Sequence, residues 1–483
     1  MAQNITLMGA SYSDVPAVVL PKTGGGTASF TDVTDTTAAA GDVASGKYFY
    51  TAAGVKTQGT ASGGGGGGSL SDQVRFFDYD GTLVDSYSKA DFNALSAMPS
   101  NPSHTGLTAQ GWNWTLAQAK AQLTACPDGV LNIGQMYTTD TGETRLYIHI
   151  DEDTPDNRLT FYVRFTSSTS NNVTLNWGDG TVETKGSTSA TNYSHTYATN
   201  GDYVIKLTVN TGTISFVGSA SYAIYGATNT TNYHNGTRIR RVEIGNNVTS
   251  VGKYAFRYCY SIISITIPST VTSIGESAFA YCTSLTSITI PSGVTSIGNN
   301  TFQYCYSLTS ITIPSGVTSI GNNAFAYCTS FTSITIPSGV TSIGNNTFQY
   351  CYAFTSIIIP SNVTSIGNYA FNYCDSLASI TILSGITSIG TYAFQYSYSL
   401  TRLTIPSSVT SIGGNAFNSC YGVGEYHFEP TTPPTITNTN VFTGIANDCK
   451  IYVPYSADHS VLTAYQTASY WSTYASRMVE ESP

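Results

Sequence analysis

Hydrophobic and polar positions repeat every 23 residues from about Arg240 to Tyr421. A clean copy of the repeat is IPSGVTSIGNNTFQYCYSLTSIT, Ile290–Thr312. Two positions of the repeat form columns through successive copies. The first is Phe256, Phe279, Phe302, Phe325, Phe348, Phe371, Phe394 and Phe417, and the second is Cys259, Cys282, Cys305, Cys328, Cys351, Cys374, Ser397 and Cys420. A fixed period with an intact apolar column predicts a solenoid of stacked units.

The repeat resembles the BspA-like (Treponema-type) leucine-rich repeats, and this resemblance covers more than a third of the chain. It implies a leucine-rich-repeat solenoid over residues 236–425. The stretch CKIYVPYSADHSVLTAYQTASYWSTYASRM resembles the cap that closes such repeats, so residues 426–483 are expected to form a C-terminal cap. A cap is physically required because the last repeat would otherwise expose its core face.

The cysteine column could suggest a metal site or disulfides. Residues one period apart in a solenoid stack at about 4.8 Å, so a ladder of identical thiols is expected at a buried small-residue position. No Cys-x-x-Cys pair is present, and Ser397 occupies the same column. The column therefore indicates a structural ladder, and we expect no metal.

Residues 157–215 carry VTLNWGDGTVET and YSHTYATNGDYVIKLTV. Asp179-Gly180 is typical of a hairpin turn, and DYVIKLTV alternates like a half-buried strand. The stretches Trp177-Gly178-Asp179-Gly180 and His195-Thr196-Tyr197 resemble the polycystic-kidney-disease (PKD) domain, which implies an immunoglobulin-like β-sandwich. Some domains of that family bind calcium, which makes Asp179 a candidate ligand, but one acid is weak support. His195 is expected to pack or to hydrogen-bond a turn.

Residues 70–152 are expected to form a small α+β module. VRFFDYD and TLVDSYS are extended runs joined at Asp80-Gly81, which predicts a two-residue hairpin turn. Ser88 is a candidate N-cap for a short helix, KADFNALSAM, and TLAQAKAQLTA predicts a second helix. VLNIGQMY and ETRLYIHI predict a closing hairpin around Asp140-Thr141-Gly142.

The same stretch contains a candidate catalytic motif, Asp-x-Asp-Gly-Thr, which resembles the first motif of the haloacid dehalogenase phosphatases. That resemblance would make Asp78 the nucleophile and Asp80 the residue that handles the leaving-group proton. Such enzymes need a parallel sheet, and the roughly 85 residues before the sandwich are too few for five strands with crossovers. The turn explains the motif without catalysis. We therefore expect no enzyme, no catalytic residue and no cofactor.

Only 10% of the residues are charged, while the chain contains 45 Gly and 35 Tyr, which is typical of β-rich extracellular or virion proteins. The net charge of −9 and the absence of a Lys/Arg cluster argue against nucleic acid as a partner. No apolar run reaches 18 residues, so no membrane insertion is expected. No secretion leader or C-terminal sorting signal is visible, and this favours a protein that leaves the cell by lysis.

Residues 63–69 contain six consecutive glycines and predict a flexible linker after an N-terminal arm, residues 1–62. The arm segment DVASGKYFYTAAGVKTQGT resembles segments of phage structural proteins, and residues 70–152 are similar to a module of gut-phage tail proteins. This resemblance implies an arm that attaches to other virion proteins, and a virion assembled in the host cytoplasm and then released. Fibrous virion proteins are often trimers, so a homotrimer stays open.

Two sets of positions are candidates for ligand binding on the solenoid. One is a band expected to face outward, Ser287, Thr289, Ser310, Thr312, Ser333 and Thr335, here called the Ser/Thr band. The other follows the cysteines, here called the outer tyrosine column: Tyr260, Thr283, Tyr306, Thr329, Tyr352, Asp375, Tyr398 and Tyr421. Tyrosine suits binding surfaces, although these rings could equally pack against neighbouring rungs.

The fold class expected is therefore mainly β and multidomain. Its parts are a β-rich N-terminal arm, a small α+β module, an immunoglobulin-like sandwich and a leucine-rich-repeat solenoid with a C-terminal cap. The function expected is a bacteriophage tail fibre or other virion-associated adhesin, whose solenoid binds a protein or glycan of a host-cell or mucosal surface. The alternative is a bacterial BspA-like cell-surface adhesin.

Overall fold

The computed structural model describes residues 73–126, 129–151, 159–218 and 234–483, together with six short strands between residues 5 and 58. The chain divides into two compact units. The first comprises Met1–Asp72 and Leu83–Ser86, and the second comprises Gln73–Thr82 and Tyr87–Pro483. The predicted glycine linker, residues 63–69, lies outside the described residues.

The first unit is rich in short antiparallel strands. Three hairpin pairs are described, β1 (Ile5–Leu7) with β2 (Ala10–Tyr12), β3 (Ala17–Pro21) with β4 (Thr27–Thr31), and β5 (Tyr48–Tyr50) with β6 (Lys56–Gln58). The β-rich arm expected from the sequence is therefore confirmed.

The α+β module has β10 at the centre of a sheet, parallel to β7 on one side and antiparallel to β9 on the other. Its elements are β7 (Val74–Phe77), β8 (Leu83–Tyr87), α1 (Lys89–Ala94), β9 (Leu107–Trp112), α2 (Leu116–Ala125) and β10 (Leu131–Thr139). Both predicted helices are present. Ser88 caps α1 and Thr115 closes a capping box on α2, which explains where each helix begins.

Two predicted turns of the module differ from the structure. Asp78 N donates to Thr82 O (2.9 Å), so the loop between β7 and β8 holds three residues rather than two. The predicted closing hairpin is wrong. Strand β10 pairs within the module, whereas the next strand, β11 (Thr144–Ile150), pairs with strands of the sandwich. Local turn chemistry at Asp140-Thr141-Gly142 predicted a reversal, but long-range pairing decides the sheet of each strand.

The sandwich is immunoglobulin-like, as expected, and its two sheets continue directly into the solenoid. The strands are β11, β12 (Thr160–Ser167), β13 (Val173–Asn176), β14 (Val182–Lys185), β15 (Thr191–Thr196), β16 (Gly201–Val209) and β17 (Ile214–Phe216). One sheet has the order β14-β13-β16-β11-β18-β20 and the other β15-β12-β17-β19-β21, so each ends on solenoid strands. The sandwich thereby closes the N-terminal end of the solenoid.

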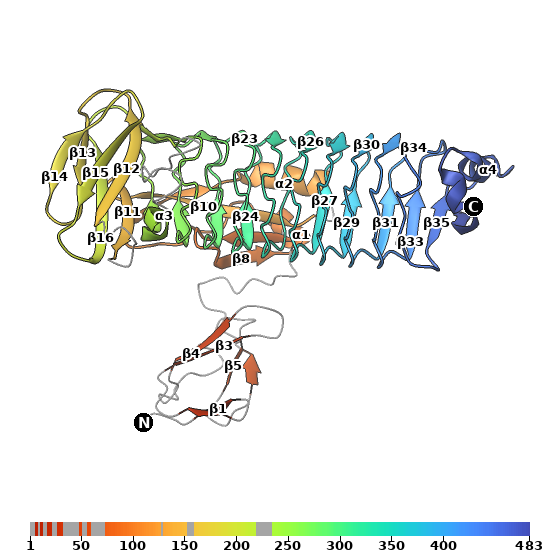
Figure 1. Cartoon of the computed structure of the whole chain (residues 1–483), viewed down its shortest axis with the longest axis horizontal. Helices are drawn as coiled ribbons and strands as arrows, with labels where there is room; N and C mark the ends of the chain where they lie inside the picture. Colours follow the sequence, from red (N-terminus) through yellow and green to blue (C-terminus); the bar gives the residue numbers. More distant parts are fainter. Residues whose placement is uncertain are drawn as a thin grey trace. The chain divides into compact units, whose positions relative to one another are not determined.

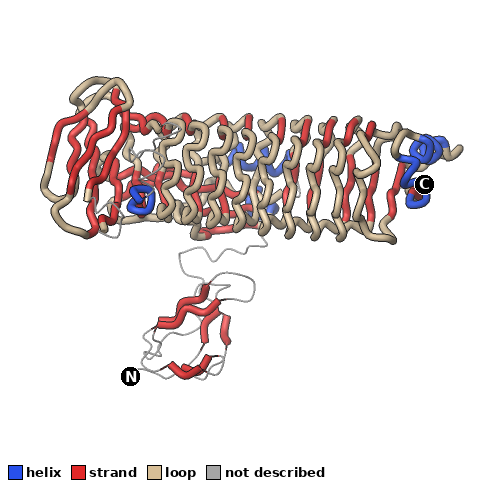
Figure 2. The backbone as a smooth tube through the Cα atoms, viewed as in Figure 1, coloured by secondary structure: helices blue, strands red, loops and turns tan. Residues whose placement is uncertain are grey.

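The rungs of the solenoid lie side by side along one axis (Figures 1 and 2). They carry strands on two faces. The long-strand face contains β18 (Ile239–Glu243), β20 (Ser264–Thr266), β22 (Ser287–Thr289), β24 (Ser310–Thr312), β27 (Ser356–Ile359), β29 (Ser379–Ile382), β31 (Arg402–Ile405), β33 (Glu425–Phe428), β35 (Lys450–Val453) and β36 (Met478–Glu480). The short-strand face contains β19 (Val248–Val251), β21 (Ser273–Ile274), β23 (Ser296–Ile297), β25 (Ser319–Ile320), β26 (Ser342–Ile343), β28 (Ser365–Ile366), β30 (Ser388–Ile389), β32 (Ser411–Ile412) and β34 (Thr435–Ile436). Helix α3 (His234–Arg238) precedes the first rung. The predicted 23-residue solenoid is confirmed.

The strands pair in parallel and in register, so equivalent residues lie on top of one another. The phenylalanine column forms one stack from Phe256 to Phe417, with centroids of successive rings 5.3 to 5.7 Å apart. These rings belong to a single apolar core that extends from Leu146 in the sandwich to Met478 in the last strand. Sandwich and solenoid therefore share their hydrophobic stabilisation.

The cysteine column is a ladder of buried free thiols, as predicted. Each thiol from Cys282 to Cys374 donates to the carbonyl of the phenylalanine in the preceding rung, for example Cys351 Sγ to Phe325 O (3.2 Å). Ser397 makes the same contact with Phe371 O (3.1 Å), which explains why serine is accepted there. Burial raises the pKa of these thiols and keeps them protonated as donors.

The C-terminal end of the core is closed by two helical segments, α4 (Ser460–Thr467) and the 3₁₀ helix η2 (Trp471–Arg477). Trp471 is buried against Phe428, with ring centroids 5.1 Å apart, and its indole N–H donates to Pro434 O (2.7 Å). The aromatic side chains of the cap thus cover the last rungs, as an exposed repeat end requires.

The thiol ladder gives a stability prediction. We expect Cys351→Ala to lower the free energy of unfolding by about 1–2 kcal/mol, because it removes the bond to Phe325 O and leaves a small void. Cys351→Ser should cost less, since Ser397 already makes this contact in the native chain. Urea unfolding of the two variants measures the difference, and equal loss in both would contradict a role for the thiol hydrogen bond.

Candidate binding surfaces of the solenoid

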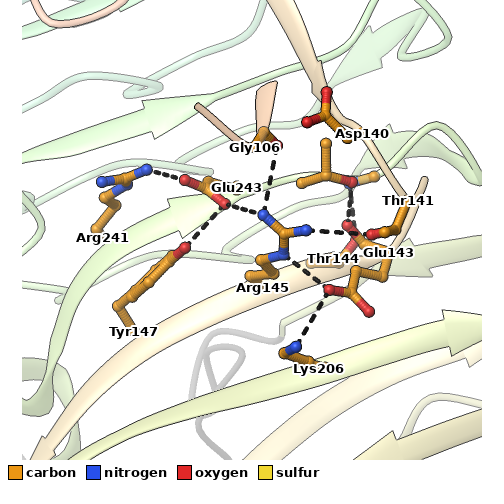
Figure 3. Close-up of polar contacts among 12 residues, drawn as sticks. Gly106, Asp140, Thr141, Glu143, Thr144, Arg145, Tyr147, Lys206, Arg241 and Glu243 are labelled. Carbon is orange, nitrogen blue, oxygen red and sulfur yellow. Dashed lines mark hydrogen bonds and ion pairs between the residues drawn. The ribbon is translucent and has the colours of Figure 1, made fainter. Parts of the chain in front are cut away.

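The module, the sandwich and the first rung meet in a polar network around Arg145 (Figure 3). Arg145 Nη1 donates to Gly106 O of the module (3.4 Å) and pairs with Glu243 of the first rung (3.3 Å). Arg145 Nε pairs with Glu143 (2.8 Å), and the Tyr147 hydroxyl donates to Glu243 (3.0 Å). Glu243 is almost completely buried, so its charge depends on these partners. The network fixes the module to the solenoid at this end.

Further along the long-strand face, the module makes hydrogen bonds with rungs that lie some 200 residues away in sequence. Asn113 Nδ2 donates to Ile290 O and Thr312 O (both 3.2 Å), and Trp114 Nε1 donates to Ile313 O (2.8 Å). Gln122 of α2 donates to Ile336 O (2.9 Å). Most of these side chains are buried, so the contact is a packed interface and not a loose association.

The Ser/Thr band lies under this module. Ser287 Oγ donates to Tyr79 O (3.1 Å), Asn132 N donates to Thr335 Oγ1 (3.0 Å), and a Cβ at Gly134 would lie only 2.2 Å from Thr312 Oγ1. Ser287, Thr289, Thr312 and Thr335 are buried, and Ser310 and Ser333 are half-buried. The expectation that this band faces solvent is wrong, because a separate part of the chain covers it. Its role in ligand binding stays a prediction.

A cavity of about 270 Å³ lies where the module ends on the long-strand face. It is lined by Leu123, Cys126 and Leu131 of the module and by Thr335, Ile358 and Thr381 of successive rungs. Ser379 and Thr381, in the rung beyond, are exposed. The cover of the module therefore stops at this point, and the later rungs leave their strand face open.

The outer tyrosine column lies on the looped side of the rungs, and its later members are exposed. Tyr306, Tyr352, Tyr398 and Tyr421 expose 42%, 40%, 38% and 56% of their surface, while Tyr260 is half-buried. Thr283, Thr329 and Asp375 occupy the intervening rungs and are half-buried. Of the two predicted surfaces, this is the one whose large side chains reach solvent.

A second tyrosine column, which sequence reasoning missed, supports the first. It comprises the residues immediately before Cys259, Cys282, Cys305, Cys328, Cys351, Cys374 and Ser397: Tyr258, Tyr281, Tyr304, Tyr327, Tyr350, Tyr373 and Tyr396, here called the inner tyrosine column. Their rings follow one another at 4.4 to 4.8 Å between centroids. Burial, with the neighbouring tyrosines, raises the pKa of Tyr327 to about 12. The run of seven tyrosines at this position, which ends at Ser419, was the available signal.

Each residue of the inner column has left-handed backbone, with φ between 57° and 64°. This conformation is uncommon for a bulky residue and costs about 1–3 kcal/mol per residue. Each backbone N–H nevertheless donates to the next rung, as Tyr327 N does to Gln349 O (2.8 Å). Ring stacking and these backbone hydrogen bonds stabilise the left-handed backbone conformation, which usually favours glycine.

The phosphatase-like motif forms a turn that docks on the solenoid. Gly81 has φ +85°, and a Cβ there would lie 2.9 Å from Ser287 Cβ. Asp78 is buried. Its Oδ1 accepts a hydrogen bond from Tyr79 N (2.8 Å), and its Oδ2 pairs with His104 Nε2 (2.6 Å). Both carboxylate oxygens are thus engaged inside the module, and the motif is explained by packing.

In the sandwich, His195 Nε2 pairs with Asp179 Oδ2 (2.6 Å), and the ring stacks on buried Trp177 at 5.2 Å. Asp179 Oδ1 accepts from Thr181 N (3.0 Å). The packing role predicted for His195 is confirmed. Within the described ranges, no group of His, Cys, Asp and Glu side chains could hold a metal ion, and no described helix is long and apolar enough to cross a membrane.

Comparison with known families assigns the repeats. Residues 229–458 match the family described as BspA type leucine rich repeat region, in three overlapping segments. No curated protein matches the chain. The leucine-rich repeats predicted from the 23-residue period are therefore confirmed as BspA-type.

Solved structures similar to this chain are leucine-rich repeat proteins of bacteria. One from T. pallidum is 26% identical, covering 39% of this chain and 82% of its own, with a TM-score of 0.32. One from Eubacterium ventriosum is also 26% identical, covering 52% and 77%, with a TM-score of 0.33. A leucine rich cell surface protein from Faecalibacterium prausnitzii is 25% identical, covering 53% and 94%, with a TM-score of 0.28.

The buried Ser/Thr band gives a prediction about the module. Gly134→Val should force β10 away from the rungs, because the added side chain would overlap Thr289 and Thr312. We expect faster hydrogen exchange in β22, β24 and α2. Gly424→Val is the matched control, since a Cβ there meets nothing within 4 Å. Unchanged exchange in Gly134→Val would show that the module does not hold this face.

Proposed function

Because the solenoid carries BspA-type leucine-rich repeats, we propose that this chain is an adhesin-type binding protein without catalytic activity, which acts at a bacterial cell surface. The proposal adopts the alternative that the sequence left open. The repeat match over residues 229–458 supports it, since the repeats resemble those of BspA-like adhesins. The virion role expected from the arm has no support from that match.

The observation that carries the proposal is the exposed outer tyrosine column on a rigid scaffold. Tyrosine offers a large, stiff contact area at small entropic cost, so it is favoured in binding surfaces. The rungs are held by parallel strand pairs and by one continuous core. The scaffold is therefore ordered before binding, which lowers the entropic cost of binding. Repetition of similar weak contacts along one ligand, or on many copies, raises avidity.

The covered Ser/Thr band is not the contact surface in this proposal. Its hydroxyls bond to Tyr79 O and Asn132 N of the module, so a ligand could reach them only after the module moves away. The partner proposed is a cell-surface protein or glycan that approaches the tyrosine side of the solenoid.

The remaining expectations from the sequence stay predictions. These are attachment of residues 1–62 to virion proteins, a virion location, a homotrimer, the PKD relationship of residues 157–215, and the boundaries of the module (70–152), solenoid (236–425) and cap (426–483). The expected absence of nucleic-acid binding also stays a prediction.

A cell-binding experiment tests the proposal. Fluorescently labelled chain should bind to host epithelial cells or to other bacteria, and the double variant Tyr306→Ala, Tyr352→Ala should reduce the bound fraction about tenfold, because two exposed anchors are lost. The double variant Tyr455→Ala, Tyr470→Ala is the control, since both tyrosines are exposed but lie outside the column. Equal binding by the two double variants would refute the tyrosine column as the contact surface.

A further inference from the structure

From Tyr260 to Tyr398 the outer tyrosine column has a two-rung period within the one-rung period of the solenoid, and Tyr421 in the next rung ends it by stacking on Tyr398, with ring centroids 5.7 Å apart. Tyrosine recurs at Tyr260, Tyr306, Tyr352 and Tyr398, with Thr283, Thr329 and Asp375 between them. Neighbouring rungs lie at the spacing of paired strands, so these tyrosines recur every ~10 Å along the solenoid axis. Three of these rings, Tyr306, Tyr352 and Tyr398, are exposed and evenly spaced, which fits a ligand that is itself periodic and extended.

The rings of the row are held in place by the inner tyrosine column. Tyr306 contacts Tyr304 and Tyr352 contacts Tyr350, each pair with ring centroids 6.1 Å apart and planes at 74° and 69°. The supporting rings are stacked along the axis and have fixed left-handed backbone. The outer rings are therefore set on a prearranged base, which lowers the entropic cost of binding.

The groups between the rings are polar and small. Thr283 and Thr329 each use their hydroxyl to bond the carbonyl of the preceding rung, at 3.1 and 3.3 Å, and keep a hydroxyl oxygen as acceptor. Asp375 lies between Tyr352 and Tyr398 and is half-buried, and its Oδ1 is buried with no hydrogen-bond partner among the described residues. The row thus alternates aromatic rings with small polar side chains, and Asp375 is the only charged residue in the column.

We propose that this row binds an extended β-1,4-linked pyranose chain that lies along the solenoid axis. Two sugar units of such a chain have about the length of two rungs, and alternate sugars present the same face because successive units are flipped. Each tyrosine would then contact every second sugar through its apolar face, while the hydroxyl oxygens of Thr283 and Thr329 accept hydrogen bonds from sugar hydroxyls. The inference deepens the proposed adhesin function and rests on it.

Titration calorimetry of the full chain with hexasaccharides tests the proposal. Cellohexaose and chitohexaose both have the extended β-1,4 geometry, so at least one should bind, and the preference between them identifies a glucose or an N-acetylglucosamine polymer as the source. Maltohexaose, whose α-1,4 links curve the chain, should bind at least tenfold more weakly. Equal affinity for maltohexaose would overturn the proposal.

A register-swap variant changes the spacing of the tyrosines in the outer column without changing their number. Thr329→Tyr with Tyr352→Thr keeps the number of tyrosines but destroys the two-rung period between Tyr306 and Tyr398. We expect a loss of about threefold to tenfold in affinity for the β-1,4 hexasaccharide, the effect of removing one aromatic contact. An unchanged melting temperature shows that the fold is intact, and Tyr455→Ala is the control that should bind normally.

The outcomes separate this inference from the proposed function. No binding of either β-1,4 chain, or equal binding by the register-swap variant, refutes the glycan while tyrosine-dependent adhesion to cells still supports an adhesin. Loss of both glycan binding and tyrosine-dependent adhesion would overturn both.

Discussion

Parallel, in-register stacking of the rungs is the constraint on which the rest of this structure depends. Because each strand of the solenoid pairs with its equivalent in the next repeat, a residue type at one position must meet itself one rung away. That condition admits stacked phenylalanines in the core, thiols that each bond the previous rung, and tyrosines that stack on the looped side. The same constraint leaves each end of the core open, and the sandwich and the C-terminal helices close it.

The features that repeat locally were predictable from the sequence. The 23-residue period fixed the solenoid and the phenylalanine stack, and the substitution at Ser397 correctly indicated a small buried group in the thiol ladder. The inner tyrosine column had an equally clear signal. The stacking of these rings could not be predicted, because left-handed backbone at tyrosine has no local sequence rule.

The predictions that failed concern contacts between segments that are distant in the sequence. Asn113 bonds Thr312 and Gln122 bonds Ile336, pairs separated by about 200 residues, and no periodicity in either segment predicts that they meet. For the same reason the Ser/Thr band was expected to be open. The asymmetry this creates matters for function. The early part of the long-strand face is used for internal packing, and the tyrosine side keeps large side chains in solvent. A scaffold with equivalent copies therefore acquires non-equivalent surfaces through one docked module.

In the function proposed here, ligand binds on the tyrosine side while the Ser/Thr band stays covered. Hydroxyl-radical footprinting of the chain, free and attached to the cells it binds, tests this most directly because tyrosine rings react readily when exposed. We expect attachment to protect Tyr306, Tyr352 and Tyr398, and β22 and β24 to stay unreactive in both states. Unprotected tyrosines, or new reactivity or ligand protection confined to the Ser/Thr band, would contradict it.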